Sequence, residues 1–101
     1  MPKLTIQIPH DLGKEEATRR LQQRFQAVKQ RFGQHVSDFE EEWNGDSMQF
    51  GFRTFGLKIS GQVESEAAGV KLSADLPMAA MMFRGTIEQQ IRDELAEMLT
   101  G

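Results

Sequence analysis

The sequence contains no cysteine and only two histidines, His10 and His35. The absence of cysteine excludes a disulfide framework, a thiolate nucleophile and a cysteine-ligated metal centre. It is also typical of reducing compartments, so we expect a cytoplasmic protein. The two histidines lie on either side of a predicted helix, about a helix length apart, and neither has a zinc-type ligand spacing nearby. We therefore predict no metal and no cofactor.

Long apolar runs and a strong excess of one charge are absent as well. The longest unbroken apolar run, Met78 to Phe83, is far short of the ~18 residues that a membrane-spanning helix needs. Met1 to Ile8 has no apolar core of signal-peptide length. A formal net charge of −3 argues against affinity for nucleic acid. At 101 residues we expect a single soluble domain, residues 1–101, with no nucleic-acid partner.

Three consecutive segments in the middle of the chain alternate apolar and polar residues: Met48–Arg53, Leu57–Glu64 and Val70–Leu76. Successive side chains of a strand point to opposite faces, so the alternation predicts strands with one apolar and one polar face. The polar face is formed by Gln49, Arg53, Lys58, Ser60, Gln62, Glu64, Lys71, Ser73 and Asp75. Such a sheet is antiparallel and needs a cover on its apolar face. Gly51 and Gly61, inside these strands, indicate bulges or the close approach of a helix.

The chain before this sheet predicts a strand and a helix. Leu4 to Ile8 alternates in the same way, and Pro9 ends that strand because it cannot donate to the ladder. A helix follows, with Asp11 as its N-cap and Gly33 as its C-cap. Its apolar residues fall on a single stripe and comprise Ala17, Leu21, Phe25, Val28 and Phe32.

The end of the chain predicts a second helix. Thr86 and Gln89 have the spacing of a capping box. The apolar residues that follow recur at helical spacing and comprise Ile87, Ile91, Leu95, Met98 and Leu99. Whether helix also covers Met78 to Phe83 stays open, because Ala and Met favour it while Gly85 opposes it by roughly 1 kcal/mol.

Val36 to Trp43 predicts a further strand, and the Asn-Gly pair after it is a strong hairpin signal. A two-residue loop pairs Phe39 with Phe50, whereas a four-residue loop pairs Trp43 with Met48. Both registers put the aromatic residues on the apolar face of the next strand, because they differ by an even step. The sequence does not fix the oligomeric state, and this edge is one place where a second copy could pair.

The predicted order is β-α-β-β-β-β-α. Each helix has one apolar stripe and the sheet has one apolar face, so we predict an α+β two-layer sandwich with both helices on one face of an antiparallel sheet. The first helix must cross the sheet, so we expect the first strand to lie beside the last one.

Short phrases along nearly the whole chain resemble one bacterial family. They are Pro2–His10, Glu15–Ala17, Arg19–Leu21, Val36–Asp38, Trp43–Gly45, Gly56–Gly61, Asp75–Pro77, Phe83–Glu88, Ile91 and Glu94–Leu95. Together they resemble the polyhydroxyalkanoic acid system family, whose genes lie near those for polyhydroxyalkanoate granules. The resemblance implies a link to granule synthesis and granule-surface proteins, and it brings no catalytic residues. The architecture also resembles a shortened helix-grip domain, a class that often holds apolar ligands between helix and sheet.

The run from Met78 to Phe83 is the first candidate site, with Met78, Met81, Met82 and Phe83 as its contact residues. Methionine suits soft, imprecise partners, and an exposed apolar patch would let a protein adhere to a polyester granule or to a granule-bound protein. The alternative is that these residues close the core beneath the last strand.

Charged residues provide two further candidates. Arg20, Arg24 and Arg31 fall on one line of the first helix and could contact a phosphate, an acidic protein or an anionic lipid. Alternatively, they form a solvated face over the sheet edge and pair with Glu40 to Glu42. Glu41 lies on the apolar face of its strand, where burial would raise its pKa and suit it to acid–base work. As an alternative, it is an inward charge that protects an edge strand.

The sequence therefore predicts a non-enzymatic accessory protein of polyhydroxyalkanoate metabolism that associates with granules or granule-bound proteins. The alternative is a carrier or sensor that binds an acyl chain or another apolar small ligand between helices and sheet. Its cavity would be lined by Phe25, Phe50, Phe52, Ile59 and Ile91. An enzyme acting on hydroxyacyl groups is less well supported, because no serine stands in a nucleophile-elbow context.

Overall fold

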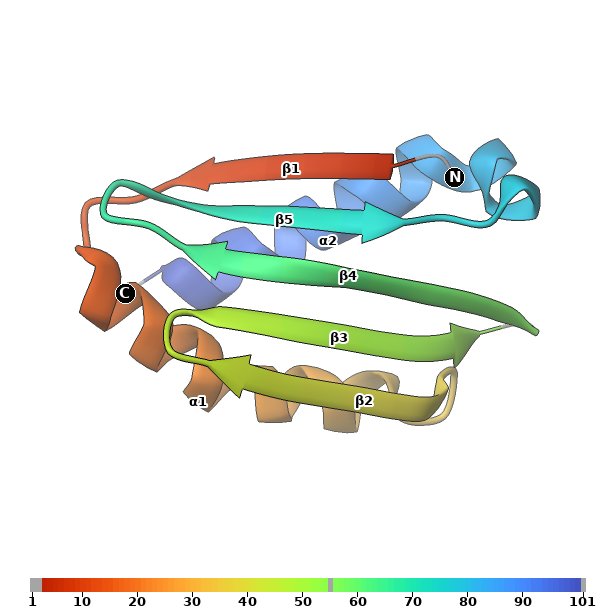
Figure 1. Ribbon diagram of the computed structural model, residues 1–101, viewed down its shortest axis with the longest axis horizontal. Coiled ribbons are helices and arrows are strands. Elements are labelled where there is room, and N and C mark those ends of the chain that lie inside the picture. Colours follow the sequence, from red (N-terminus) through yellow and green to blue (C-terminus); the bar gives the residue numbers. More distant parts are fainter. Residues whose placement is uncertain (1–2, 55, 101) are drawn as a thin grey trace.

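The computed structural model describes residues 3–54 and 56–100, apart from the side chain of residue 32. The helices and strands follow the predicted β-α-β-β-β-β-α order, with one short 3₁₀ helix, η1, added before the last helix (Figure 1). Their bounds are β1 Lys3–Pro9, α1 Lys14–Phe32, β2 Ser37–Asn44, β3 Ser47–Thr54, β4 Leu57–Ser65, β5 Gly69–Asp75, η1 Met78–Phe83 and α2 Arg84–Leu99.

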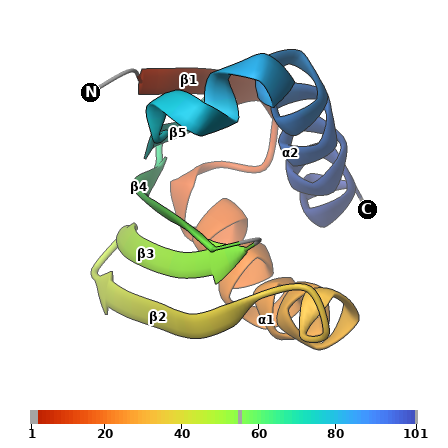
Figure 2. The same ribbon diagram turned by 90° about the vertical axis from the view of Figure 1, so that its right-hand side faces the viewer.

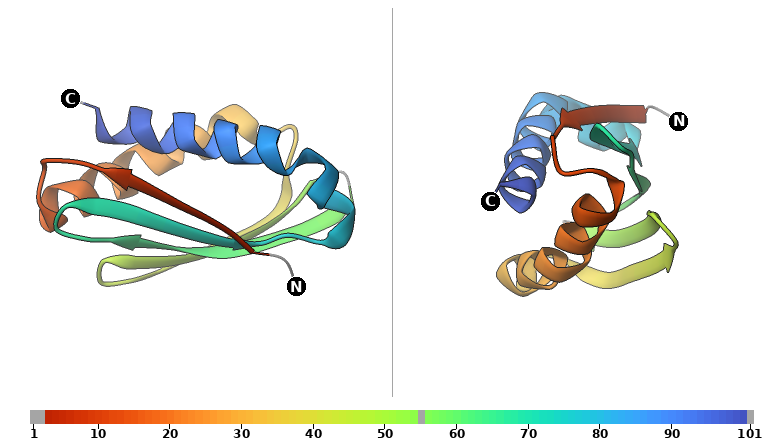
Figure 3. Two further views of the ribbon diagram at one scale, coloured as in Figure 1. Left: turned by 90° about the horizontal axis from the view of Figure 1, so that it is seen from above. Right: turned by 90° about the vertical axis from the view of Figure 1, so that its left-hand side faces the viewer.

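The five strands form one antiparallel sheet in the order β1-β5-β4-β3-β2. β1 lies beside β5, with Ile6 opposite Leu72, which confirms the expected pairing of the first strand with the last. Both helices cover the same face of the sheet (Figure 3, left). The predicted α+β two-layer sandwich is therefore confirmed.

The β2–β3 hairpin has the second of the two predicted registers, in which Trp43 pairs with Met48. Gly45 has a φ of 64°, a conformation that a tight hairpin turn requires and that glycine adopts without strain. The ladder is interrupted between Ser37 and Glu40, where Asp38 has a φ of 52°. β2 is an edge strand of the sheet, as expected.

Gly61 lies in the middle of β4, the central strand of a sheet that curves around the helices (Figure 2). A Cβ atom on this residue would collide with the backbone oxygen of Ser73 and would lie 2.8 Å from the Phe50 ring. The predicted close approach of another element to Gly61 is confirmed. The prediction that a helix would make it was wrong, because strand β5 and the Phe50 ring lie there instead. Gly51 on β3 pairs in regular register with Ser60, so it marks no bulge against β4.

α1 begins later than predicted, at Lys14, and its N-cap is Gly13 with a φ of 81°. The expected Asp11 cap was therefore wrong. The backbone N–H of Leu12 donates instead to Nδ1 of His10, 3.1 Å away. This side-chain hydrogen bond stabilises the turn that leads into α1. The predicted end of the helix, with Gly33 as C-cap, is confirmed.

α2 begins earlier than predicted, at Arg84, and has no side-chain cap. The capping box of Thr86 and Gln89 was wrong, because η1 runs directly into α2. The backbone N–H of Arg84 donates to the carbonyl of Met81, so the preceding 3₁₀ turn supplies a partner that a capping side chain would otherwise supply.

The core lies between the sheet and the two helices, and its burial is graded along them. Its buried residues are Leu4, Ile6, Ala17, Leu21, Met48, Ile59, Val63, Val70, Leu72, Ala74, Leu76, Ala80, Leu95, Met98 and Leu99. On α1 Ala17 and Leu21 are buried, whereas Phe25 and Val28 are half-buried. The side chain of Phe32, the fifth member of the predicted stripe, lies outside the described residues. α2 follows the same gradient, with a buried C-terminal half and half-buried Ile87 and Ile91.

Candidate functional site

The most exposed apolar side chains of the described residues come from η1. The exposed fractions are 76 % for Met78, 86 % for Met82 and 59 % for Phe83. Met81 is half-buried. These four side chains are named the apolar tip below. η1 lies at one end of the molecule, beside the start of α2 (Figure 1).

The local sequence explains why the tip stands clear of the core. Leu76 is fully buried after the last strand, and Pro77 then turns the chain with φ −62° and ψ 153°. Ala80 is the one buried residue of η1, and its backbone N–H donates to the carbonyl of Pro77 at 2.9 Å. A small alanine therefore anchors the segment, and the larger side chains of Met78 and Met82 remain outside.

The tip presents about as much apolar surface as the largest patch of an ordinary monomeric protein. A side chain of this size covers roughly 150–200 Å². With the exposed fractions of Met78, Met82 and Phe83, the patch amounts to on the order of 400 Å² of apolar surface. The largest apolar patch of a typical monomeric protein covers about 300–600 Å² and is often functional.

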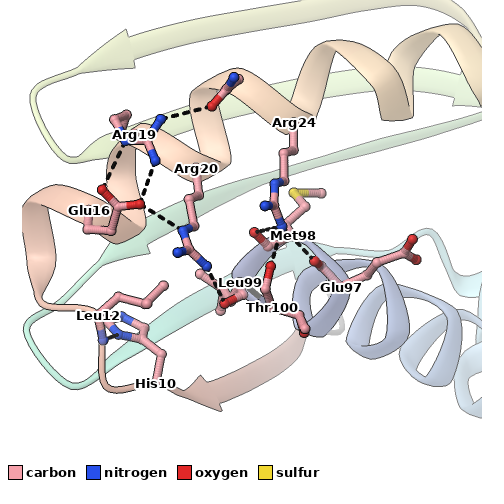
Figure 4. Close-up of polar contacts among 11 residues, drawn as sticks. His10, Leu12, Glu16, Arg19, Arg20, Arg24, Glu97, Met98, Leu99 and Thr100 are labelled. Carbon is pink, nitrogen blue, oxygen red and sulfur yellow. Dashed lines mark hydrogen bonds and ion pairs between the residues drawn. The ribbon is translucent and has the colours of Figure 1, made fainter.

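The predicted arginine line joins α1 to the C-terminal end of α2 (Figure 4). Arg20 Nη1 donates to the carbonyl of Leu99 at 3.1 Å. Arg24 Nη1 donates to three further carbonyls at this end, those of Glu97 at 3.0 Å and Met98 at 2.9 Å in α2 and that of its C-cap, Thr100, at 2.6 Å. The last carbonyls of a helix lack intrahelical donors and carry partial negative charge, so two guanidinium groups stabilise this end of α2.

Carboxylates of both helices complete this contact. Arg31 forms an ion pair with Glu94 of α2, and Arg20 Nε donates to Glu16 at 2.8 Å. Hydrogen bonds from Arg19 and then Arg20 lower the pKa of Glu16 to about 2. The alternative was that the arginines pair with Glu40 to Glu42. Their contacts described here are instead with Glu16 of α1, Glu94 of α2 and the carbonyls at the end of α2. Contact with an external anion stays a prediction.

Glu41 accepts two hydrogen bonds, from Lys29 Nζ of α1 and from Trp43 Nε1, both at 2.7 Å. Burial by itself raises the pKa of Glu41, but the hydrogen bonds from Lys29 and Trp43 outweigh it and hold this pKa below its usual range. The expectation that burial would raise the pKa and suit Glu41 to acid–base work was therefore wrong. The carboxylate instead ties the edge strand β2 to α1.

Three of the five predicted cavity residues, Phe25, Phe50 and Phe52, belong to a row of aromatic rings from α1, β2 and β3. Ring centroids are 5.6 Å apart for Phe25 and Phe39, 6.0 Å for Phe39 and Phe52, and 6.2 Å for Phe50 and Phe52. Ile59 is buried, and Ile91 is half-buried on α2. Phe39 connects the row and was missing from the predicted cavity lining. It could have been included, because its spacing from Trp43 had already put it on the apolar face of the sheet.

Two open hollows of the described surface lie elsewhere. One is lined by residues 12–16 and Arg19 at the start of α1. The other, of about 590 Å³, crosses the open face of the sheet and is bordered by polar side chains such as Gln49, Gln62 and Ser73. Both are open to solvent, and the aromatic row borders the second only through Phe50.

Residues 3–54 and 56–100 contain neither a cluster of metal ligands nor a helix that could span a membrane. His10 and His35 lie before and after α1, and no group of three His, Asp or Glu side chains there could hold a metal ion. In the same residues, neither helix combines the length and apolarity that crossing a membrane demands.

The sequence was also compared with known proteins. Comparison with curated proteins and with solved structures gave no match. A family model described as polyhydroxyalkanoic acid system protein matches residues 4–99, which is nearly the whole chain. The chain therefore belongs to the polyhydroxyalkanoic acid system protein family.

Proposed function

We propose that the chain is a non-enzymatic accessory protein of polyhydroxyalkanoate metabolism that associates with granules in the cytoplasm through its apolar tip. The observation that supports this most directly is the exposure of Met78, Met82 and Phe83 at one end of a protein of this family. Exposed apolar patches mark interaction sites, and methionine adapts to surfaces without a fixed shape.

The size of the tip favours an extended apolar phase over a single protein partner. A stable protein interface buries roughly 800 Å² on each side, about twice what the tip offers. Insertion of on the order of 400 Å² at about 25 cal/mol per Å² gives an upper limit near 10 kcal/mol, before the costs of immobilisation. A polyester surface accepts such an insertion at any point, so adhesion through the tip would need no partner of complementary shape.

Co-sedimentation tests this proposal with three kinds of particle: native granules, protein-stripped polymer particles and phospholipid vesicles. We expect the protein to sediment with native granules and with stripped polymer. Binding to native granules alone would replace polymer contact with a granule-bound protein partner. Absence of binding to all three would overturn granule association.

A tip variant identifies the contact in the same assay. Met78→Ser with Met82→Ser removes apolar surface from two exposed positions and leaves the buried Ala80 anchor in place. We expect this variant to lose binding to bare polymer. A matched control, Met78→Leu with Met82→Leu, keeps an apolar side chain of similar volume at both positions and should bind as the parent does.

A carrier or sensor for an acyl chain is the second candidate. It is supported by the half-buried apolar residues Phe25 and Val28 of α1 and Ile87 and Ile91 of α2, toward which the burial of the core declines. Titration with a fluorescent fatty acid would test it. Saturable 1:1 binding that Ile91→Gln weakens would favour the carrier, and the absence of saturable binding would remove it.

The non-enzymatic part of the proposal has its own test. Glu41, the carboxylate considered above as an acid or base, is engaged with Lys29 and Trp43 and has a lowered pKa. We expect the pure protein to show no hydrolysis or hydration of hydroxyacyl esters. Turnover that co-purifies with the protein and is lost in a single-residue variant would contradict it.

A further inference from the structure

The methionines of the chain differ sharply in exposure. Met48 and Met98 are buried, with exposed fractions of 2 % and 6 %, and Met81 is half-buried. Met78 and Met82, at 76 % and 86 %, are open to solvent. The sequence contains no cysteine, so no thiol of the chain competes with these thioethers for an oxidant.

The reaction available to an exposed thioether is two-electron oxidation by a peroxide. The sulfur attacks one peroxide oxygen, the O–O bond breaks and an S=O bond forms. With hydrogen peroxide, the other oxygen leaves as water. The product, methionine sulfoxide, is polar, and methionine sulfoxide reductases return it to the thioether.

We propose that Met78 and Met82 are oxidation sites, and that their conversion to sulfoxides by peroxide releases the protein from an apolar surface. The release rests on the proposed function, whereas the selectivity of the oxidation follows from exposure alone. Two of the three most exposed apolar side chains of the described residues are these methionines, so their oxidation leaves Phe83 as the one strongly exposed apolar contact.

The consequences for fold and for adhesion separate cleanly. The buried side chains of Ala80 and Leu76 anchor η1 to the core. Neither contains sulfur, so oxidation at Met78 and Met82 leaves this anchor intact. Full burial of a methionine side chain is worth enough that its loss lowers a binding constant about tenfold or more. We therefore expect each sulfoxide to weaken adhesion by about tenfold.

Limited treatment of the free protein with hydrogen peroxide, followed by peptide mass mapping, tests the sites. We expect Met78 and Met82 to gain one oxygen each before Met48 and Met98 do. Oxidation of Met48 or Met98 at the same rate would overturn the site assignment. This measurement requires no granule.

Sedimentation with stripped polymer particles tests the release. We expect binding of the untreated protein, about tenfold weaker binding after each oxidation, and recovery after treatment with a methionine sulfoxide reductase. Met78→Leu with Met82→Leu should bind before and after peroxide. If oxidised protein binds as well as untreated protein, the release is refuted while the proposed function stands; if untreated protein does not bind, both fail, and the mapping still decides the sites.

Discussion

Replacement of Gly61 by alanine tests the close packing of β4 against β5 and Phe50. The new Cβ would collide with the backbone oxygen of Ser73 and lie 2.8 Å from the Phe50 ring and 2.9 Å from Cα of Ala74. Two of these three neighbours are backbone atoms of β5, which cannot turn away as the end of a flexible side chain can. Overpacking of this kind costs about 3 kcal/mol or more, because strands must separate to relieve it.

Part of this cost is offset in the unfolded chain. Replacing glycine by alanine reduces the freedom of the unfolded state, which stabilises a protein by about 0.4–1 kcal/mol where the native conformation permits it. The net loss expected for Gly61→Ala is therefore about 2–3 kcal/mol. At a typical dependence of about 1–3 kcal/mol per molar urea, the unfolding midpoint should fall by roughly 0.7–3 M.

Gly51→Ala on the neighbouring strand is the matched control. Its Cβ would meet the side-chain ends of Glu40 and Lys58 at 3.4 Å, an ordinary contact with groups that can move. We expect its free energy of unfolding to stay within about 0.5 kcal/mol of the parent value or to rise. Equal midpoints for Gly61→Ala and Gly51→Ala would refute the collision at Gly61.

Two further predictions concern the contact between the helices. Arg24→Ala should lower the free energy of unfolding by about 1–2 kcal/mol, because the carbonyls that Arg24 contacts at the end of α2 lose a charged donor. Arg24→Lys keeps one charged nitrogen and should recover part of this loss in urea unfolding, because Nη1 alone makes the three contacts. No recovery by lysine would argue against a contact made by one charged nitrogen. Glu16 has a pKa of about 2 in the folded protein, below its unfolded value, so its contribution to stability is fully present above about pH 4.5 and is lost as the pH falls toward 2. The stability difference between parent and Glu16→Gln should therefore be constant at neutral pH and shrink across that acidic window, and a difference that persists at pH 2 would contradict the assignment.

The strands could be predicted because a period of two depends only on side-chain direction. The alternation from Met48 to Arg53 predicted both the strand and its apolar face. Both possible hairpin registers put the aromatic residues of the preceding strand on that same face. The helix starts could not be predicted in the same way. Asp11 and Thr86 are good caps by residue type, but a histidine nitrogen closes the turn before α1, and a 3₁₀ turn leads directly into α2.

The candidate sites show a similar division. Helical spacing placed Arg20 and Arg24 on one line, but their partners are backbone carbonyls of residues 97–100, and spacing within one helix carries no information about them. The run from Met78 to Phe83 was visible as an apolar segment. Its exposure could not be predicted, because an apolar run has the same composition whether its side chains fill the core or face solvent. The anchoring of Ala80 decides which side chains face solvent.

The most direct test of granule association is a binding isotherm on a protein-free polyhydroxyalkanoate film, recorded for the parent and for two variants of the apolar tip. The account predicts that the parent and Met78→Leu with Met82→Leu bind with similar affinity, and that Met78→Ser with Met82→Ser binds at least about tenfold more weakly. Equal binding of the serine and leucine variants, or no binding by the parent, would contradict adhesion through the tip.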